Sequence, residues 1–344
     1  MLTTLISLFL IGGPADQPWE KLESKYLSNT TQVTHGFVRA GEGYFSPDGK
    51  KIIFQAELRG GHNPFYQIYM QELATRKLHR VSTGEGKTTC SYFHPTKANR
   101  VIFASSHLDP KAKTHYGEEY KIRADLKKSG KRRRYVWDFD PYMEIFSSDP
   151  KGKKLKRLTD TKGYDAEGSY SPDGKQIVFC SNRSGKDNLE LYIMDADGNN
   201  VRKLTDAPGC YNGGPFFSPD GKKVIFRSDR KKKDHLQIYV INVDGTGEKA
   251  LTNDLGWVYW APYWYKDSKH IIYTAADHTQ PRRPNYDLYW MNIETGKTVR
   301  ITHAPSADVL PVFSPDYTKI MWTSTRSEDR SSQLFLADFV APKE

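Results

Sequence analysis

The chain of 344 residues has few cysteines and lacks the local motifs of several enzyme classes. Only Cys90, Cys180 and Cys210 occur, and no two of them form a Cys-x-x-Cys pair. An odd, sparse set is no disulfide framework, and cysteines in strand-like sequence are commonly buried free thiols. No Gly-x-Ser-x-Gly elbow and no His-Glu-x-x-His pair is present, which argues against a serine hydrolase triad and a zinc peptidase site.

The charge balance is moderately basic, with 51 Lys and Arg residues against 41 Asp and Glu residues. A net charge of +10 spread over a chain of this size favours anionic partners only weakly. A soluble surface with excess lysine explains the same balance. We therefore expect no nucleic-acid partner.

A long apolar run is also missing, apart from residues 2–13 at the start. This run is too short to span a bilayer, and the small residues Gly13-Pro14-Ala15 follow it. The pattern resembles a signal-peptide core with cleavage after Ala15, and no lipobox cysteine follows. We expect residues 1–15 to be a signal peptide and the mature protein to be periplasmic or secreted, with no membrane span.

The sequence does contain a repeat built on Ser-Pro-Asp-Gly-Lys. Three full copies and three degraded copies begin at positions 46, 94, 171, 218, 266 and 314. An aromatic residue precedes each copy and an apolar run follows it, which is typical of a hairpin with a tight turn. Successive copies lie 47–48 residues apart, except for one step of 77. A period in the forties with four strands per unit indicates propeller blades.

The two ends of the repeat array complement each other. The sixth unit stops after its third strand near Phe339, and a spare strand, Thr31–Thr34, precedes the first unit. We predict an all-β fold over residues 16–344, a single six-bladed β-propeller of four-stranded antiparallel blades. The N-terminal strand should pair with the last blade and close the ring of a monomer. The residues before and after the blades are expected to have no part in the core.

The repeat consensus resembles the TolB-type (PD40) six-bladed propeller across residues 26–340. It combines Ser-Pro-Asp-Gly-Lys-x-Ile-x-Phe, Leu-Tyr-x-Met-Asp-x-Asp-Gly and Arg-x-Leu-Thr. The α/β domain that precedes the propeller in TolB has no counterpart in these residues. The resemblance is therefore to stand-alone exported TolB-like propellers, and it puts a Tol–Pal role in doubt.

The topology predicts which face holds a site. The Ser-Pro-Asp-Gly turns end the innermost strands on one face, so the starts of those strands and the loops between second and third strands share the opposite face. Charged and polar residues collect there and suit a binding site at the mouth of the central channel. The candidates are Glu42, Thr88, His107, Asp165, Glu167, Arg183, Asn212, Arg230, His278 and Asp308. The alternative is that these residues cap strands and satisfy backbone groups.

A metal site is the most specific form of this hypothesis. His107, Glu167 and His278 could supply ligands for Ca²⁺, Mn²⁺ or Zn²⁺, although they would have to converge from three blades. A lactonase-like Ca²⁺ site could instead use Glu42, Asn212 and Asp308. No residue is assigned a catalytic role.

The long repeat step is a basic insertion at residues 108–134, between the second and third strands of the second blade. It is rich in Lys and Arg, and residues 118–128 could form a short helix ended by Ser129-Gly130. The insertion is either a solvated loop or an arm that presents positive charge to an anionic ligand.

Two functions follow from these observations. The first is an exported, non-catalytic binding or scaffold propeller whose ligand, an anionic glycan or an envelope protein, sits on the face of the strand 2–3 loops. The alternative is a metal-dependent carbohydrate-active enzyme, a polyuronide lyase or a lactonase-like hydrolase, that uses the same funnel.

Overall fold

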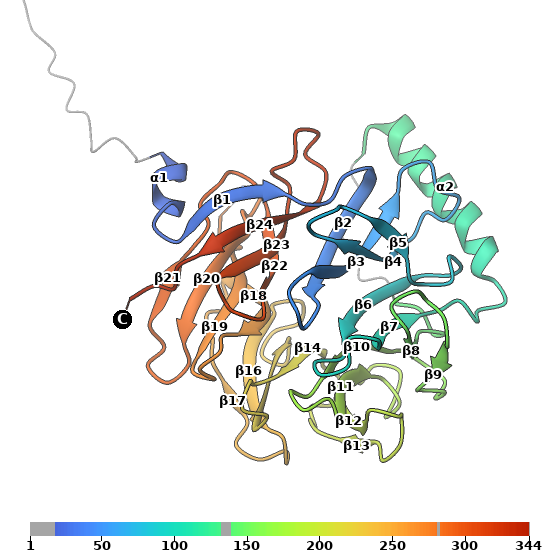
Figure 1. The fold of residues 1–344 in the computed structure, drawn as a ribbon. Coiled ribbons are helices and arrows are strands. Elements are labelled where there is room, and N and C mark those ends of the chain that lie inside the picture. Colours follow the sequence, from blue (N-terminus) through green and yellow to red (C-terminus); the bar gives the residue numbers. More distant parts are fainter. Residues whose placement is uncertain (1–17, 132–138, 281–282, 344) are drawn as a thin grey trace, which may run out of the picture.

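The computed structural model describes residues 18–131, 139–280 and 283–343. The expected signal peptide and residues 132–134 of the insertion lie outside these ranges. Six four-stranded antiparallel sheets surround one axis as the blades of a propeller (Figure 1), which confirms the predicted fold. Among the described residues, no helix is both long and apolar enough to cross a membrane.

Each of the first three blades is a consecutive run of four strands. Blade 1 consists of β2 (Phe37–Phe45), β3 (Lys51–Leu58), β4 (Gln67–Glu72) and β5 (Leu78–Arg80). Blade 2 consists of β6 (Thr88–Phe93), β7 (Val101–Ser105), β8 (Glu144–Ser148) and β9 (Lys156–Arg157). Blade 3 consists of β10 (Asp165–Tyr170), β11 (Gln176–Ser181), β12 (Glu190–Asp195) and β13 (Arg202–Lys203).

The other three blades include the one that joins both ends of the chain. Blade 4 consists of β14 (Asn212–Phe217), β15 (Lys223–Ser228), β16 (Gln237–Asn242) and β17 (Lys249–Ala250). Blade 5 consists of β18 (Trp257–Trp264), β19 (His270–Asp277), β20 (Asp287–Asn292) and β21 (Thr298–Arg300). Blade 6 consists of β22 (Asp308–Phe313), β23 (Lys319–Ser324), β24 (Gln333–Phe339) and β1 (Leu27–Gln32).

The repeated turn satisfies its own polar groups. In the first copy, the Ser46 hydroxyl donates to Asp48 at 2.6 Å and accepts from the Lys51 amide at 2.9 Å. Asp48 also accepts from the Lys50 amide at 3.1 Å, and Gly49 adopts a φ of 68°. The copies that begin at Ser171 and Ser218 repeat these bonds. The motif therefore recurs because each residue type closes the same hairpin.

The threonine of Arg-x-Leu-Thr has an equally local role. In blade 3 the Thr205 hydroxyl donates to Glu190 at 2.6 Å and accepts from the Leu191 amide at 2.9 Å. It thereby fastens the start of the third strand to the end of the fourth. Equivalent hydroxyls accept from the third strand in the other blades, namely Ser82, Thr159, Thr252, Thr302 and Thr34.

The ring closes as predicted. β1 pairs antiparallel with β24, from Leu27 opposite Phe339 to Gln32 opposite Phe335. Thr34 then takes the place of the strand-four threonine, because its hydroxyl donates to Gln333 at 2.9 Å. The first and last parts of the chain thus complete one sheet and leave no open gap in the ring.

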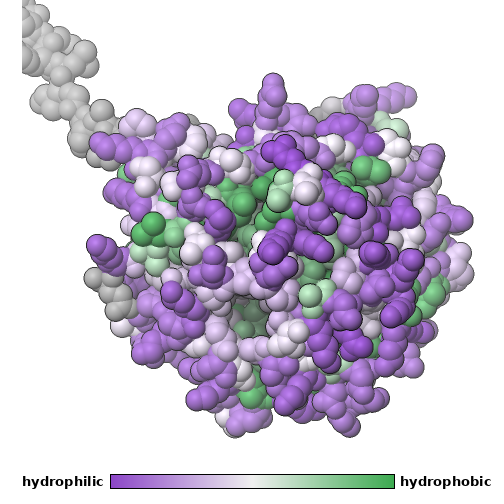
Figure 2. Space-filling model, in the orientation of Figure 1, coloured by the Kyte–Doolittle hydropathy of each residue, from purple (hydrophilic) through white to green (hydrophobic). Residues whose placement is uncertain are grey.

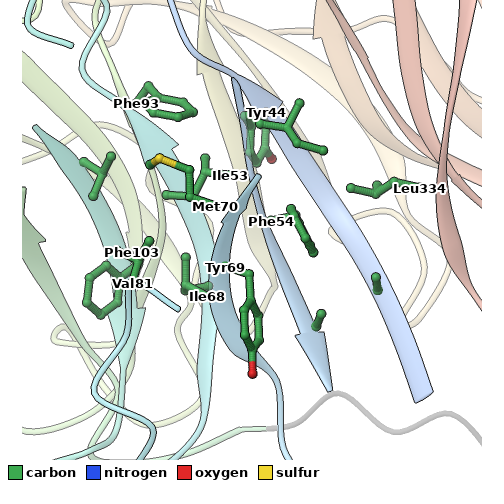
Figure 3. Packing of buried hydrophobic residues seen from close by; sticks show 14 of the residues in the cluster. Tyr44, Ile53, Phe54, Ile68, Tyr69, Met70, Val81, Phe93, Phe103 and Leu334 are labelled. Carbon is green, nitrogen blue, oxygen red and sulfur yellow. The ribbon is translucent and has the colours of Figure 1, made fainter. Parts of the chain in front are cut away.

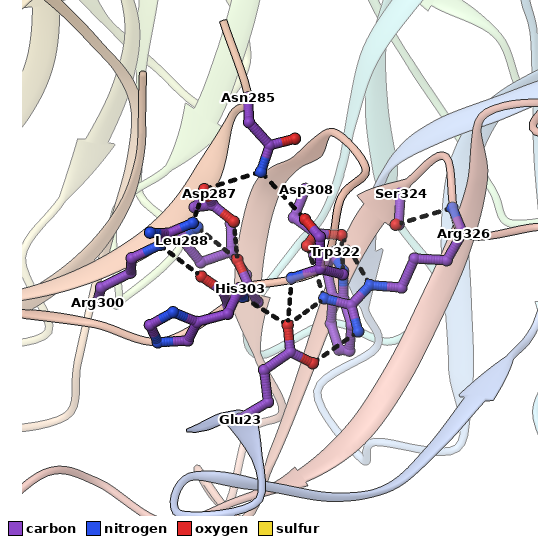
Figure 4. A network of polar contacts seen from close by, with 12 residues as sticks. Glu23, Asn285, Asp287, Leu288, Arg300, His303, Asp308, Trp322, Ser324 and Arg326 are labelled. Carbon is purple, nitrogen blue, oxygen red and sulfur yellow. Dashed lines mark hydrogen bonds and ion pairs between the residues drawn. The ribbon is translucent and has the colours of Figure 1, made fainter. Parts of the chain in front are cut away.

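The expectation that the residues before the blades have no core role is wrong for α1 (Trp19–Glu23). Glu23 is only 5% exposed and accepts from the amides of His303 and Ala304. Its carboxylate also pairs with Arg326 at 2.7 Å (Figure 4). This carboxylate fixes the N-terminal segment to blades 5 and 6, which hydrophobic periodicity alone could not indicate.

The core lies between blades as well as within them. The second strands are apolar at successive positions, as in Ile52-Ile53-Phe54, because both faces of each blade are covered. Figure 3 shows Ile53, Phe54, Ile68 and Met70 of blade 1 close to residues of neighbouring blades. All three cysteines are free thiols, as expected.

Candidate functional site

Six equivalent positions on the innermost strands share an unusual backbone conformation. Each lies in a β-bulge and has a positive φ between 49° and 58°. Such bulges redirect a side chain, and non-glycine residues there carry a backbone strain. The positions are Glu42, Cys90, Glu167, Gly214, Ala261 and Leu310, one per blade. We call them the axial ring.

The axial ring is polar on one side and apolar on the other. Neighbouring blades contribute Glu42, Cys90 and Glu167, and the other half has only glycine, alanine and leucine. Burial raises the pKa of the Cys90 thiol well above its usual value, and the nearby Glu42 and Glu167 carboxylates raise it further. The thiol therefore stays neutral, and any charge in the ring belongs to the two glutamates.

Glu167 is held by a fully paired cluster. Its carboxylate pairs with Arg227 at 2.9 Å and accepts from the Tyr211 hydroxyl at 2.9 Å and the Gly214 amide at 2.5 Å. Arg227 also donates to the Tyr211 oxygen at 2.7 Å and lies over the Trp260 ring. Such a buried ion pair is maintained only with good geometry and additional hydrogen bonds.

Two glycines make room for this cluster. A Cβ at Gly213 would overlap the Tyr211 hydroxyl and the Glu167 carboxylate, and a Cβ at Gly214 would overlap the Arg227 guanidinium. Glu167 was among the residues predicted to line the channel mouth, whereas its partners Tyr211 and Arg227 were not predicted as site residues. The paired glycines were the signal that could have indicated a crowded site.

Glu42 differs from Glu167 because no cation pairs with it among the described residues. Burial raises its pKa to about 7, and the Glu167 carboxylate adds to the rise while Cys90 and Arg227 oppose it. The side chain is nevertheless half-buried, so solvent reaches it deep in the molecule. It is flanked by Gly41 and Gly43, where a Cβ would press on Thr323 and Leu334 of blade 6.

An aromatic layer crosses the axis two residues further along the inner strands. Tyr44, Tyr92, Phe216 and Tyr263 come from four blades, and their ring centroids lie 4.9–6.5 Å apart. The Tyr92 and Tyr263 hydroxyls, from opposite blades, are 3.2 Å apart. This aromatic layer lies between the axial ring and the Ser-Pro-Asp-Gly turns, so the ring faces the opposite side, which we call the loop face.

Five of the predicted binding residues belong to a repeated clamp of paired side chains. Arg183 pairs with Asp165 at 2.9 Å and lies over the rings of Phe179 and Tyr192 in its own blade. Arg230 with Asn212 repeats this arrangement in blade 4, and Arg326 with Asp308 repeats it in blade 6. These groups join the first strand to the loop after the second strand and are already satisfied.

Thr88, His107 and His278 also have partners, from the neighbouring blade for Thr88 and from the same blade for the two histidines. The Thr88 hydroxyl donates to the Tyr66 carbonyl at 2.9 Å. His107 lies 2.9 Å from the Ser105 hydroxyl, and burial lowers its pKa. His278 lies 2.8 Å from the Tyr286 hydroxyl, and burial together with His235 lowers its pKa.

The expected metal ligands do not converge. His107 belongs to blade 2 and His278 to blade 5 on the opposite side of the ring, while Glu167 is occupied by Arg227 and Tyr211. Within the described ranges, no three His, Cys, Asp or Glu side chains are grouped to hold an ion. In the lactonase-like set, Asn212 and Asp308 hold arginines of the clamps, so neither set fits a metal site.

Two cavities open on the loop face. One, of about 450 Å³, lies beside the start of β18 and the β19–β20 loop and is lined by Trp257, Tyr289 and Arg300, among others. The other, of about 350 Å³, is lined by Tyr211, Lys186 and Lys233, among others. Neither is centred on the axial ring, but the second shares Tyr211 with the Glu167 cluster.

The insertion forms a longer helix than predicted, α2 (Ala112–Ser129), which ends at Gly130 with a φ of 65°. The prediction began at residue 118. The helix begins earlier, where packing holds it, since the Tyr116 oxygen accepts from the Gly86 amide at 2.7 Å. Arg123 then pairs with Glu57 at 2.5 Å and fixes α2 to the β3–β4 side of blade 1 on the loop face.

The comparisons with known proteins agree with this architecture. Residues 186–283 match the PD40 family, described as the TolB beta propeller domain. An uncharacterized peptidase of Bacillus subtilis, YuxL, is 26% identical over 169 residues, which is 47% of this chain and 25% of that protein. The matched stretches span about a quarter of the length of the curated relatives.

Solved structures resemble the whole ring. A putative TolB from Agrobacterium tumefaciens has a TM-score of 0.58 at 19% identity, covering 88% of this chain and 91% of that one. An oligogalacturonate lyase from Vibrio parahaemolyticus has a TM-score of 0.53 at 15% identity, covering 90% and 93%. At such identities the likeness concerns the fold alone. The chain is therefore a six-bladed β-propeller that contains a match to the TolB beta propeller domain at residues 186–283.

Proposed function

We propose that this chain is an exported, non-catalytic binding propeller that holds an anionic glycan on its loop face. The observation that carries the proposal is that both described cavities lie on this face. The opposite face presents turns whose polar groups are internally bonded, with the aromatic layer between them and the axial ring. These features favour the loop face as the place where a ligand binds.

The chemistry of the second cavity favours an anionic, ring-shaped ligand. Lys186 and Lys233 are exposed at its edge, and Phe139 and Tyr211 supply aromatic surface. Ammonium groups attract carboxylate or sulfate, and aromatic faces stack on sugar rings. The surface in Figure 2 is largely hydrophilic, with hydrophobic residues visible in the central hollow and in scattered patches elsewhere.

A glycan array of neutral, uronate-containing and sulfated oligosaccharides tests this proposal. The purified chain is expected to bind anionic members, and high salt should weaken the binding because exposed charges are screened. Binding to neutral glycans alone, or to none, would overturn it.

The enzyme alternative has less support from the side chains. No group of three His, Cys, Asp or Glu side chains that could hold a metal ion is found among the described residues. Incubation of the chain with polygalacturonate and Mn²⁺ should yield no unsaturated product. Steady product formation by the purified chain would show that the enzyme alternative is correct.

Export is a separate part of the proposal. The apolar run at residues 2–13 and the small residues up to Ala15 support it. Mass spectrometry of the protein from periplasmic or culture fractions should find a mature N-terminus at Asp16. An intact N-terminus in a cytoplasmic fraction would contradict export without affecting the binding proposal.

A further inference from the structure

The axial ring contains one carboxyl group that the protein itself does not neutralise. Glu167 has Arg227 at 2.9 Å, whereas no Lys, Arg or His of the described chain pairs with Glu42. The Glu42 carboxylate has uncharged partners instead, the Tyr44 hydroxyl at 3.5 Å and the Cys90 thiol. An ionised carboxylate that is deep in a protein and lacks a counter-charge is costly, so a bound cation would stabilise it.

The groups that face Glu42 do not compete for such a cation. Tyr44 on the same strand, Tyr66 before β4 and Cys90 on β6 all have pKa values raised chiefly by burial, so they stay neutral. From β10 and β15, Glu167 and Arg227 neutralise each other.

The remaining neighbours also carry no charge. On β23 of blade 6, Thr323 offers a hydroxyl that accepts from the Glu42 amide at 3.0 Å. Burial raises the pKa of Tyr92 on β6 and, to well above its usual value, that of Tyr263 on β18. Glu42 is thus the one group of this neighbourhood that changes charge near neutral pH.

The rest of the ring and the layer beneath it offer uncharged surfaces. On the side away from Glu42 the ring has Gly214, Ala261 and Leu310, whose side chains carry no charge. The aromatic layer beneath it presents Tyr44, Tyr92 and Tyr263, and aromatic faces attract ammonium groups. Trp260 is half-buried at the same level.

We infer that the axial ring is a subsite for a protonated amine, which Glu42 binds as its counter-ion above the aromatic layer. The amine could belong to an aliphatic ligand, a lysine side chain or an amino-substituted sugar, which share this chemistry. The inference rests on the proposed function only in that the ligand enters from the loop face. Lys186 and Lys233 at the edge of the second cavity would then bind the anionic groups of a ligand, and Glu42 in the axial ring would bind its amine.

Calorimetric titration with matched pairs of probes tests the inference. The amines are n-butylamine, Nα-acetyl-lysine amide and 2-aminoethyl glucoside, and their neutral counterparts are n-butanol, Nα-acetyl-norleucine amide and 2-hydroxyethyl glucoside. At pH 8 at least one amine should bind about tenfold or more tightly than its counterpart. The pair with the largest ratio identifies the source of the amine.

The pH dependence of amine binding and the variant Glu42→Gln test whether Glu42 is the group that binds the amine. With a pKa of about 7, Glu42 is mostly ionised at pH 8 and mostly protonated at pH 5.5, so amine affinity should fall about tenfold or more between them. Glu42→Gln should lose that affinity and its pH dependence, while Glu328→Gln, at an exposed position, should retain both. A melting curve confirms that each variant is folded.

Equal binding of amine and neutral probes, or unchanged amine binding in Glu42→Gln, would overturn the inference. So would the absence of binding by every amine. These results would leave glycan binding on the array intact, whereas failure of the array alone would overturn the proposed function and not the amine subsite.

Discussion

At the scale of single residues, the structure separates two uses of the same chemistry. Asp165 with Arg183 and Glu167 with Arg227 are both carboxylate–guanidinium pairs at 2.9 Å. The first repeats in other blades as a clamp, and the second occurs once and is coupled to an unpaired neighbour, Glu42. Perturbed groups that break a repeat are better candidates for function than perturbed groups that follow it.

The first prediction concerns the stability cost of Glu42. Its folded-state pKa of about 7 lies above the ordinary value of 4.5, so the folded protein retains this proton more strongly than the unfolded chain does. Stability from this group is present at low pH and is lost as pH rises through 7. Glu42→Gln should therefore raise the free energy of unfolding at pH 8 by about 1–3 kcal/mol.

Urea denaturation at two pH values measures this effect. At pH 4 the variant and the parent should agree within about 0.5 kcal/mol, because Glu42 is then mostly neutral in both the folded and the unfolded state. A variant less stable than the parent at pH 8 would show that Glu42 has a stabilising partner.

At the scale of elements, α1 and α2 are fixed to the ring by buried polar contacts rather than by apolar stripes. Glu23→Ala removes the carboxylate that accepts from two amides of blades 5 and 6 and pairs with Arg326. Breaking such a buried network should lower the free energy of unfolding by about 2–4 kcal/mol. Glu20→Ala, at an exposed position of the same helix, should change it by less than about 0.5 kcal/mol in urea denaturation. Equal effects of the two substitutions would contradict this account of α1.

For α2, the central contact is Arg123, which donates to Glu57, Glu119 and the Pro64 carbonyl. Arg123→Ala should speed amide hydrogen exchange across residues 112–129, while global stability changes little because the ring core is untouched. Lys121→Ala, on the exposed side of the helix, serves as the control. Unchanged exchange in Arg123→Ala would mean that the tyrosine contacts alone hold the helix.

At the scale of the whole molecule, the repeat predicted the fold because its determinants are local. Each Ser-Pro-Asp-Gly turn and each strand-four threonine satisfies groups only a few residues away or in the adjoining strand. The period therefore gave the number of blades, and the missing strand in blade 6 gave the closure through β1. The contact of α1 with the ring could not be predicted in this way, because the partners of Glu23 lie about 280 residues later in the sequence.

The site was predicted less well, for a physical reason. The clamps and a ligand site contain the same residue types, and only the sequence spacing between paired residues distinguishes a clamp from a ligand site. Asp165 and Arg183, Asn212 and Arg230, and Asp308 and Arg326 are each 18 residues apart, a regularity that marks them as structural. Arg227 had no such signal, because its sequence resembles that of any second strand and the room for its guanidinium depends on the absence of a side chain at Gly214.

The central claim is that binding belongs to the loop face, and two double variants test it most directly. Lys186→Ala with Lys233→Ala removes two positive charges from that face, and Lys175→Ala with Lys222→Ala removes two from the turns on the opposite face. Both variants have the same net charge, so a general electrostatic effect would be the same in each. In a titration with the anionic glycan that binds best on the array, the first variant should lose affinity about tenfold and the second should stay within about twofold of the parent. Equal losses, or a larger loss in the second variant, would contradict the account.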